Sequence, residues 1–447
     1  MRRLLIANRG EIAVRIARSA RELGIETVAI VSEADRDAFI TRVADRTVVI
    51  GPAAAKDSYL NQEAVLAAAE HAGADAVHPG YGFLSENAAF ARAVIAAGLI
   101  WVGPDPETIE LMGDKSNAIR AARVAGVPVL PGTGGPLSAD DDVVTIARGI
   151  GYPLLVKASA GGGGRGIRHI AGEDELIPTI ELASSEAASV FGDPSVYLER
   201  FVPQARHVEV QLLADGVHCI HLGDRDCSLQ RRSQKIVEEA PAPEIPDHVR
   251  ERMRTAAVRL ASASGYRGAG TVEFLYDPAR EEAAFIEMNT RLQVEHTITE
   301  EITGVDLVRE QLRIASGEPL GLRQEDIRFV GHAIECRINA EDPSQNFFPS
   351  PGSISVMEWP AGIRVDSGFE AGDVVVPFYD SMIAKVVVHA ATRSEAIERM
   401  RAALAATRIE GIETTIPLHL RLLEDADFVK TAHHTKTIEN GKILEEL

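Results

Sequence analysis

FIEMNTRLQVEH, at positions 285–296, carries a polar side chain at every second position. The polar series consists of Glu287, Asn289, Arg291, Gln293 and Glu295. Alternate side chains of a β-strand point to one face, so an extended segment would present these residues in one row. A solvated strand face needs no such mixture of acids, amides and a guanidinium. The pattern therefore predicts a site that holds a metal ion together with an anion.

A second strand candidate, GTVEFLY at 270–276, precedes this row, and turn-like residues join the two. The simplest hairpin register, centred on Arg280, sets Glu273 directly opposite Glu287. Two facing carboxylates repel each other unless a divalent cation lies between them. Ligands that are all oxygen suit Mg²⁺ or Mn²⁺ better than Zn²⁺. We therefore expect this pair of glutamates to hold Mg²⁺ or Mn²⁺.

The composition is that of an ordinary globular protein of roughly two to four domains, with 447 residues, 45% hydrophobic and 25% charged. A net charge of −20 argues against nucleic acid as a partner, because such binding needs an excess of Lys and Arg. The apolar run at the start is too short for a signal peptide, and no later segment approaches transmembrane length, so we expect no membrane partner. Three cysteines without a CxxC pair fit a reduced, cytoplasmic compartment best.

Residues 1–112 alternate short apolar runs with helical patterns, beginning with RLLIAN at 3–8. Strand–helix–strand alternation predicts an α/β fold with a doubly wound, mostly parallel sheet. The first turn, ANRGEIA at 7–13, lacks the G-x-G-x-x-G pattern of dinucleotide sites. We therefore assign residues 1–112 to a Rossmann-like N-terminal unit with another role.

Two further units follow. Residues 113–316 combine helical segments with strand patterns whose alternation after His207 predicts an antiparallel sheet. Within this unit, we expect residues 131–203 to form a mobile lid. Residues 331–440 mix strand patterns with one amphipathic helix. The predicted fold class is therefore α/β with added α+β elements.

A glycine-rich loop, SAGGGGRG at 159–166, follows a strand pattern that ends at Lys157. Consecutive glycines let backbone N–H groups approach phosphate oxygens, and a nearby lysine adds positive charge. The spacing does not match a Walker A loop, and a flexible surface linker is the alternative. The strand context and the two flanking cations favour a phosphate site.

The segment GDRDCSLQRRSQK at 223–235 is dense in charge. A solvated charge run and a docking site for an anionic substrate explain it equally well. Cys227 has no histidine positioned by the sequence to activate it, so we expect an inert thiol. Elsewhere, HPGYGF at 78–83 predicts a turn that places Tyr81 at the carboxyl end of a strand, where parallel sheets open towards ligands.

Together these segments resemble the biotin carboxylase family of ATP-grasp enzymes, the component of acetyl-, propionyl- and related acyl-CoA carboxylases. The resemblance covers essentially the whole chain and rests on motifs in this order: LLIANRGEIAVRI, HPGYGFLSEN, GDK, KASAGGGGRG, RDCSLQRRSQK, EEAPAP, GTVEF, FIEMNTRLQVEH, ECRINAED, PSPG and YDSMIAK. It implies an ATP-grasp central unit whose glycine-rich loop closes as a lid. The family's carrier domain bears biotin on a lysine that follows a methionine. No Met here is followed by Lys, so we expect the carrier to be a separate polypeptide.

The resemblance also implies roles for single residues. ATP would be bound by Lys115, Lys157, Gly162, Gly163, Gly164 and Gly166, with Glu199, Val202, His207, Gln230 and Leu275 around adenine and ribose. The metal would be held by Glu273, Glu287 and Asn289. Bicarbonate would be bound by Lys235, Arg291, Gln293 and the Val294 backbone, with Glu295 as general base. Biotin would meet Tyr81 and Arg337, whose guanidinium would stabilise charge on the ureido oxygen. The catalytic set would be Lys235, Arg291, Glu295 and Arg337.

Three positions depart from the family pattern. Ser233 stands where many members carry His and others carry Asn, which puts the nucleotide contact there in question. Ala160 replaces a frequent Gly at the entrance to the lid and would stiffen that hinge. Thr297 replaces the usual Pro after the glutamate–histidine pair and loosens φ beside the base.

The implied activity is ATP- and bicarbonate-dependent carboxylation of biotin through carboxyphosphate, the first half-reaction of an acyl-CoA carboxylase. The implied partners are a biotin carboxyl carrier protein, a carboxyltransferase and a second copy of the chain in a homodimer. One alternative is another ATP-grasp ligase that joins a carboxylate to an amine. It would need the two facing glutamates and the lid, but not the set of Arg291, Gln293, Glu295 and Arg337. A second alternative is a non-catalytic nucleotide-binding protein that serves assembly, and the intact charged row argues against it.

Overall fold

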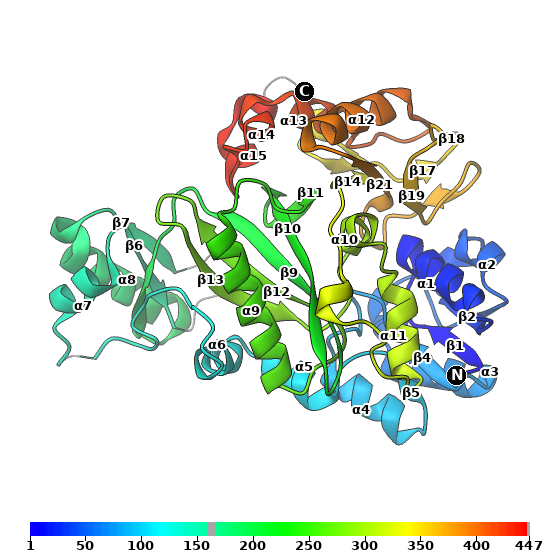
Figure 1. The fold of residues 1–447 in the computed structure, drawn as a ribbon, viewed down its shortest axis with the longest axis horizontal. Helices are drawn as coiled ribbons and strands as arrows, with labels where there is room; N and C mark the ends of the chain where they lie inside the picture. Colours follow the sequence, from blue (N-terminus) through cyan, green and yellow to red (C-terminus); the bar gives the residue numbers. More distant parts are fainter. Residues whose placement is uncertain (139, 160–165, 445–447) are drawn as a thin grey trace.

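The computed structural model describes residues 1–138, 140–159 and 166–444 and has a mixed α/β fold (Figure 1). Its N-terminal unit is a parallel sheet in the order β3-β2-β1-β4-β5, which confirms the predicted parallel layer. Adjacent residues of the central strand β1 enter two different cores, Leu4 on one face and Leu5 on the other. This explains why its sequence is a continuous apolar run. The strands are β1 (Arg3–Ile6), β2 (Glu26–Val31), β3 (Arg46–Val49), β4 (Ala76–His78) and β5 (Ile100–Trp101).

Helices cover both faces of this parallel sheet. The core on one face includes buried residues of α1, and the core on the other face includes residues of α3 and α4. A connection through α5 leads to α6 and the central unit. The helices of this region are α1 (Gly10–Glu22), α2 (Ile40–Val43), α3 (Gln62–Ala72), α4 (Ala88–Ala96), α5 (Pro106–Gly113) and α6 (Lys115–Val124).

The largest sheet runs through both the second and the third predicted units. Its order is β13-β12-β9-β10-β11-β14-β21-β19, and its neighbouring strands are antiparallel, as predicted after His207. Val208 and Val210 of β9 join the core beneath α9 (Asp247–Ala263), so Glu209 and Gln211 project from the opposite face. The strands are β9 (Arg206–Asp215), β10 (Cys219–Arg231), β11 (Gln234–Ala240), β12 (Arg267–Asp277), β13 (Glu282–Asn289), β14 (His332–Asn339), β19 (Arg364–Ser367) and β21 (Met382–Ala390).

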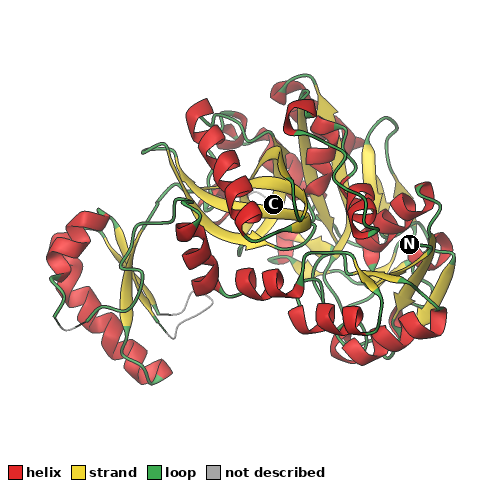
Figure 2. Cartoon of the chain, turned by 60° about the horizontal axis from the view of Figure 1, so that its bottom comes forward, coloured by secondary structure: helices red, strands yellow, loops and turns green. Residues whose placement is uncertain are grey.

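The region predicted to be a lid projects from one side of the molecule (Figures 1 and 2). It has its own three-stranded sheet and its own hydrophobic core, separate from the core under α9. The elements are α7 (Val143–Ile150), β6 (Leu154–Ala158), β7 (Ile167–Ile170), α8 (Leu176–Phe191) and β8 (Val196–Arg200). A body with its own core can move as a unit relative to the large sheet.

The last third of the chain adds β14, β19 and β21 to the large sheet and covers them with helices and small strands. His433, near the end of the chain, is buried 3.4 Å from Asp226 of β10 and ties this region to the central strands. Its other elements are α12 (Arg393–Ala406), α13 (Ile416–Glu424), α14 (Ala426–Val429), α15 (Thr437–Asn440), β15 (Glu341–Asp342), β16 (Phe348–Pro349), β17 (Gly352–Ser353), β18 (Val356–Glu358), β20 (Val374–Val375) and β22 (Arg408–Glu410). Among the residues described, no helix is both long and apolar enough to span a membrane.

Candidate active site

The hairpin β12–β13 places Glu273 directly opposite Glu287, which confirms the predicted register at this pair. A β-bulge makes this register possible. Near the turn, Asp277 pairs with Glu282, and past Phe274 the pairing shifts by one residue. Without the extra residue on β13, Glu273 would face Ile286, and Glu287 would point to the other side of the sheet.

The prediction that the whole polar row lies on one strand was wrong. Strand β13 ends at Asn289, and residues 290–295 form an irregular turn before α10 (His296–Thr303). Leu292 in this turn is fully buried in the core of the N-terminal unit, which draws the chain out of the sheet. The polar side chains still return to the site, because Gln293 donates to Glu273 over 2.6 Å.

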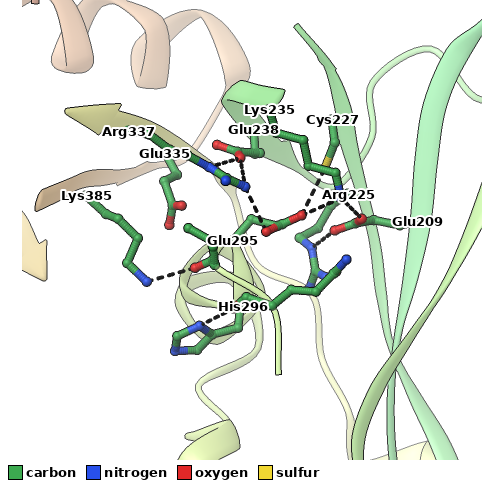
Figure 3. A network of polar contacts seen from close by, with 12 residues as sticks. Glu209, Arg225, Cys227, Lys235, Glu238, Glu295, His296, Glu335, Arg337 and Lys385 are labelled. Atoms are coloured by element: carbon green, nitrogen blue, oxygen red, sulfur yellow. Dashed lines mark hydrogen bonds and ion pairs between the residues drawn. The ribbon is translucent and has the colours of Figure 1, made fainter. Parts of the chain in front are cut away.

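Lys235 of β11 lies at the centre of the site (Figure 3). Its ammonium is 2.7 Å from Glu209, 2.9 Å from Glu273 and 2.6 Å from Glu295. Burial alone would lower the pKa of Lys235, but the three carboxylates raise it well above its usual value. Burial alone would raise the pKa of Glu295, but Lys235 and Arg337 lower it well below its usual value. Glu295 is therefore ionised at neutral pH, as a general base must be.

Arg337 of β14 connects the proposed base to a second buried acid. Its Nε donates over 2.6 Å to Glu238, and its Nη2 donates over 3.0 Å to Glu295. Arg337 and Lys235 also line a shallow hollow beside Phe347. The guanidinium is thus fixed next to the base and also borders this hollow.

The two facing glutamates and Asn289 fit a divalent cation. Glu287 is exposed on one side, yet partial loss of hydration, followed by the charge of Glu273, raises its pKa, and a cation between the two acids would remove that repulsion. Oδ1 of Asn289, the atom that would bind a metal, accepts from Arg291 over 2.6 Å in this structure. Glu273 itself is held by Lys235 and by His207, whose Nε2 lies 2.7 Å away. A metal would therefore share this carboxylate with its present cationic neighbours.

The turn that carries the proposed bicarbonate residues is fastened by contacts from distant segments. Arg291 donates over 2.9 Å to Glu86, which lies in the HPGYGFLSEN motif. The buried ammonium of Lys385 donates over 2.8 Å to the carbonyl of Val294. The ring of Tyr81 lies 5.9 Å from the same ammonium. Tyr81, proposed for biotin, is therefore close to the turn that ends at the base.

Sequence reasoning missed Arg225, which is completely buried on β10. It donates over 2.5 Å to Glu209 and over 2.7 Å to Gln293, so it connects the neighbours of Lys235 to the turn. The charged segment at 223–235 is therefore no solvated run but the hairpin β10–β11 with a buried guanidinium. The alternating polar residues of HVEVQLLAD could have indicated this, because they mark the polar face of β9 against which Arg225 lies.

The proposed nucleotide residues lie at the junction of the lid and the large sheet. In the lid, Lys157 forms an ion pair with Glu199 across β6 and β8. Val202 and Leu275 line a cavity of about 270 Å³ at the base of the lid. Nε2 of Gln230 lies 2.9 Å from Nδ1 of His207. Lys115 begins α6, and its charge offsets part of the rise in the pKa of Glu287. Gly166 precedes β7.

Several predicted positions do not contact the centre of the site or lie outside the described residues. Gly162, Gly163, Gly164 and Ala160 belong to the part of the chain that is not described. Ser233 lies at the exposed tip of the hairpin β10–β11 with a φ of 64°.

Cys227 is buried with its Sγ 3.9 Å from Glu295, and burial together with neighbouring acids raises its pKa well above the usual value. This agrees with the expectation of an inert thiol.

Models of three protein families match consecutive parts of the chain. They are the biotin carboxylase N-terminal domain over residues 1–109, the ATP-binding domain of the carbamoyl-phosphate synthase L chain over 114–323, and the biotin carboxylase C-terminal domain over 335–440. The chain is 53% identical to biotin carboxylase 1 of Bacillus subtilis over 447 residues, which is 99% of each chain. The chain belongs to the biotin carboxylase family.

Other relatives in the biotin carboxylase family serve different final substrates. A pyruvate carboxylase component of Methanothermobacter thermautotrophicus is 51% identical, over 98% of this chain and 89% of the relative. The biotin carboxylase domain of 2-oxoglutarate carboxylase from Hydrogenobacter thermophilus, solved as a dimer with MgADP, ADP and bicarbonate, has a TM-score of 0.86 and 47% identity, covering 99% of this chain and 98% of that one. As a family member, the chain is an ATP-grasp ligase.

Proposed function

We propose that this enzyme carboxylates biotin with ATP and bicarbonate, through carboxyphosphate, and releases ADP and phosphate. One observation carries the proposal. Lys235 contacts both Glu273, which we propose as a metal ligand, and Glu295. Glu295 in turn contacts Arg337. The residues that we propose as the base for bicarbonate and as the cation for the ureido oxygen of biotin, Glu295 and Arg337, are thus in contact.

ATP would bind between the lid and the large sheet. Lys115 and Lys157, with the glycine-rich loop, would neutralise the phosphates, while Val202 and Leu275 would contact the adenine. When bound, Mg²⁺ or Mn²⁺ would neutralise phosphate charge and orient the transferred group. Phosphate oxygens would replace Glu199 as the partner of Lys157. The metal ligands would be Glu273, Glu287 and Asn289.

Bicarbonate would occupy the space among the polar residues of the turn. Lys235 and Arg291 would neutralise its charge, and Gln293 with the Val294 backbone would orient it. Glu295 would remove its proton, because bicarbonate is a weak nucleophile and phosphoryl transfer depends on positioning and charge neutralisation. Closing the lid would keep water away from the carboxyphosphate product, which hydrolyses readily.

Biotin would approach through the hollow beside Arg337. Carboxyphosphate would break down to CO₂ and phosphate, the phosphate would accept the proton from N1′, and N1′ would then bond to CO₂. As N1′ loses its proton, negative charge grows on the ureido oxygen, and a fixed guanidinium would stabilise that charge like an oxyanion hole. Tyr81 would flank the bicyclic ring near the same turn. Arg337 would be positioned in advance because Glu238 and Glu295 hold it from two sides.

The decisive experiment measures ADP release with free biotin, bicarbonate and Mg²⁺, each omitted in turn. We expect ADP release to require all three, with carboxybiotin as the product. ADP release that ignores bicarbonate but responds to an amine would favour the carboxylate–amine ligase. No ADP release under any condition, with normal ATP binding, would favour the non-catalytic assembly protein.

We also propose the partners that such a reaction requires. They are a separate biotin carboxyl carrier protein, a carboxyltransferase that receives the carboxyl group, and a second copy of the chain in a homodimer. The dimer of the Hydrogenobacter relative supports the last of these. An acyl-CoA carboxylase is the complex that we propose, and relatives that act on keto acids are the alternative. Three free cysteines support a cytoplasmic location.

A further inference from the structure

Two buried acids face each other behind Arg337. Glu238 of β11 and Glu335 of β14 are directly opposite in the antiparallel ladder, and both are fully buried. The Cβ atoms of such facing residues lie about 5 Å apart, so the two carboxyl groups can meet. Neither acid belongs to the sets proposed above for ATP, metal, bicarbonate or biotin. Figure 3 shows both of them beside Arg337.

Each of the two acids has one oxygen with a donor and one without. Oε1 of Glu238 accepts from Arg337 over 2.6 Å, and Oε2 of Glu335 accepts from the hydroxyl of Thr297. Oε2 of Glu238 and Oε1 of Glu335 are buried and have no partner among the described residues. Two acceptors without donors on facing acids are both satisfied if one acid carries a proton and donates it to the other.

The charges around the pair also favour a single negative charge. Arg337 is shared with Glu295, which is ionised. Of the nearby cations on neighbouring strands, Lys235 contacts Glu209, Glu273 and Glu295. Lys385, whose charge offsets part of the rise in the pKa of Glu335, donates to the Val294 carbonyl. Two fully ionised acids would therefore depend on cations that they share with other groups, which is costly for buried charges.

We propose that Glu238 and Glu335 hold one proton between them, as a carboxyl–carboxylate pair that positions Arg337. The pKa shifts of the two acids agree with this geometry. Burial is the main cause that raises the pKa of Glu238 to about 8, and burial also raises the pKa of Glu335. Because the two groups interact, the proton belongs to the pair and not to one residue.

The consequence for catalysis rests on the proposed function. With one proton, the pair carries a single negative charge that balances Arg337 and leaves the guanidinium available to the ureido oxygen. When the pair loses this proton, a second negative charge draws Arg337 away from biotin. Biotin-dependent turnover should therefore fall as pH rises through about 8, the pKa of Glu238. Glu238 and Glu335 are thus positioning residues.

Infrared spectroscopy of the full chain without substrates tests the shared proton, because it detects the carbonyl stretch of a protonated carboxyl group. Burial raises the pKa of Glu11 to about 7, so Glu11 contributes a band of its own that fades before Glu238, with a pKa of about 8, loses its proton. The measurement is therefore the difference spectrum above pH 7, and we expect the wild type to lose carbonyl intensity as pH rises through about 8. This loss should be absent from both Glu238→Gln and Glu335→Gln, since either amide can donate to the remaining carboxylate. A wild type without the loss, or a loss that survives in both variants, overturns the proposal.

Glu239→Gln is the matched control, since Glu239 is a buried acid on the same strand. Burial alone would raise its pKa, but His332 and Arg393 lower it to about 2, so this variant must keep the loss of carbonyl intensity. Circular dichroism verifies folding, and the wild-type pH titration decides the question alone if neither glutamine variant folds.

In activity profiles, the fall in biotin-dependent turnover at alkaline pH should disappear in Glu238→Gln and Glu335→Gln and persist in Glu239→Gln. If the wild type shows the loss of infrared intensity but no biotin-dependent turnover, the proposed function is contradicted and the shared proton remains supported.

Discussion

At the scale of single residues, the side chains proposed to bind substrates already neutralise each other. Lys157 pairs with Glu199 in the lid, and Lys235 pairs with Glu273 and Glu295 in the sheet. Removing one partner of a buried ion pair leaves an uncompensated charge and typically costs about 3–5 kcal/mol. Substrate binding at this site would be an exchange of ionic partners, and conservative substitutions are the informative ones.

Glu295→Gln tests the general base. We expect bicarbonate-dependent ADP release to fall at least about a hundredfold, because the amide cannot accept the proton. ATP affinity should stay within about threefold of the wild type, since the nucleotide residues are untouched. The measurement is steady-state ADP release alongside ATP binding by calorimetry. Wild-type activity in this variant would refute the assignment of the base.

Arg225→Lys tests a positioning residue that the sequence did not reveal. Lysine keeps the charge but cannot span from Glu209 to Gln293, which Arg225 contacts over 2.5 and 2.7 Å. Loss of a hydrogen bond to a charged group costs about 1.5–3 kcal/mol, so the KM for bicarbonate should rise roughly tenfold or more. The KM for ATP serves as the internal control. An equal rise in both constants would mean general disruption instead of lost positioning.

At the scale of elements, a bulge and a turn place the chemistry. The bulge in the hairpin β12–β13 keeps Glu273 and Glu287 on one face, and the turn at 290–295 carries Gln293 back to Glu273. The helix α10 then begins directly after Glu295, and its second residue, Thr297, bonds a buried acid of β14.

Glu287→Gln separates metal binding from hairpin stability. Without metal, the variant should be more stable by about 0.5 kcal/mol, because the repulsion between facing acids is gone. The Mg²⁺ concentration for half-maximal activity should rise at least about tenfold, as expected when a metal site loses a ligand. Thermal unfolding with and without Mg²⁺, together with Mg²⁺ titration of activity, measures both effects. If Glu287→Gln is less stable than the wild type without metal, the claim that Glu273 and Glu287 repel each other is contradicted.

Thr297→Pro restores the residue usual in the family. Proline is tolerated in the first helical turn, so the fold should persist. Loss of the hydroxyl that bonds Glu335 should cost about 1 kcal/mol. Thr297→Val is the matched control, because it removes the hydroxyl without proline's constraint. Chemical denaturation should show the same decrease in the free energy of unfolding for both variants. A much larger decrease for Thr297→Pro would show that the proline disturbs the backbone and that the hydroxyl is not the main cause.

At the scale of the whole molecule, buried contacts join the N-terminal unit to the large sheet next to the site. Glu11 of α1 lies 3.5 Å from Lys385 of β21, and the same lysine holds the Val294 carbonyl. Arg15 of α1 donates over 2.8 Å to Glu300 of α10. The site is therefore assembled from all three predicted units, and packing of the first helix supports the turn that carries the proposed base.

Glu11→Gln tests this junction through pH. Burial raises the pKa of Glu11 from 4.5 to about 7, so the native state holds a proton that the unfolded state has lost. Its stabilising contribution is present below pH 4.5 and is lost as pH rises to about 7, so the variant should gain up to about 3 kcal/mol relative to the wild type across that window. Urea unfolding at both ends of the window measures the difference. A difference independent of pH would refute the prediction.

By itself, the sequence determined the features that depend on short separations along the chain. The parallel layer follows from alternating strand and helix patterns, and the Glu273–Glu287 pair follows from a local hairpin. Periodicity and turn chemistry are local properties, which is why these predictions were confirmed. The polar row was predicted as one strand because its spacing has period two, and only the burial of Leu292 in another unit bends it into a turn.

Only the tertiary structure decided which distant charges meet. Lys385 reaches Val294 across 91 positions of the chain, and strand order alone sets Glu238 against Glu335. Arg225 became the buried centre of a polar network because β9 and β10 are paired and α10 closes over them. The reason is physical: a strand pattern shows which residues share a face, whereas the neighbour across that face depends on the free energy of packing the whole sheet.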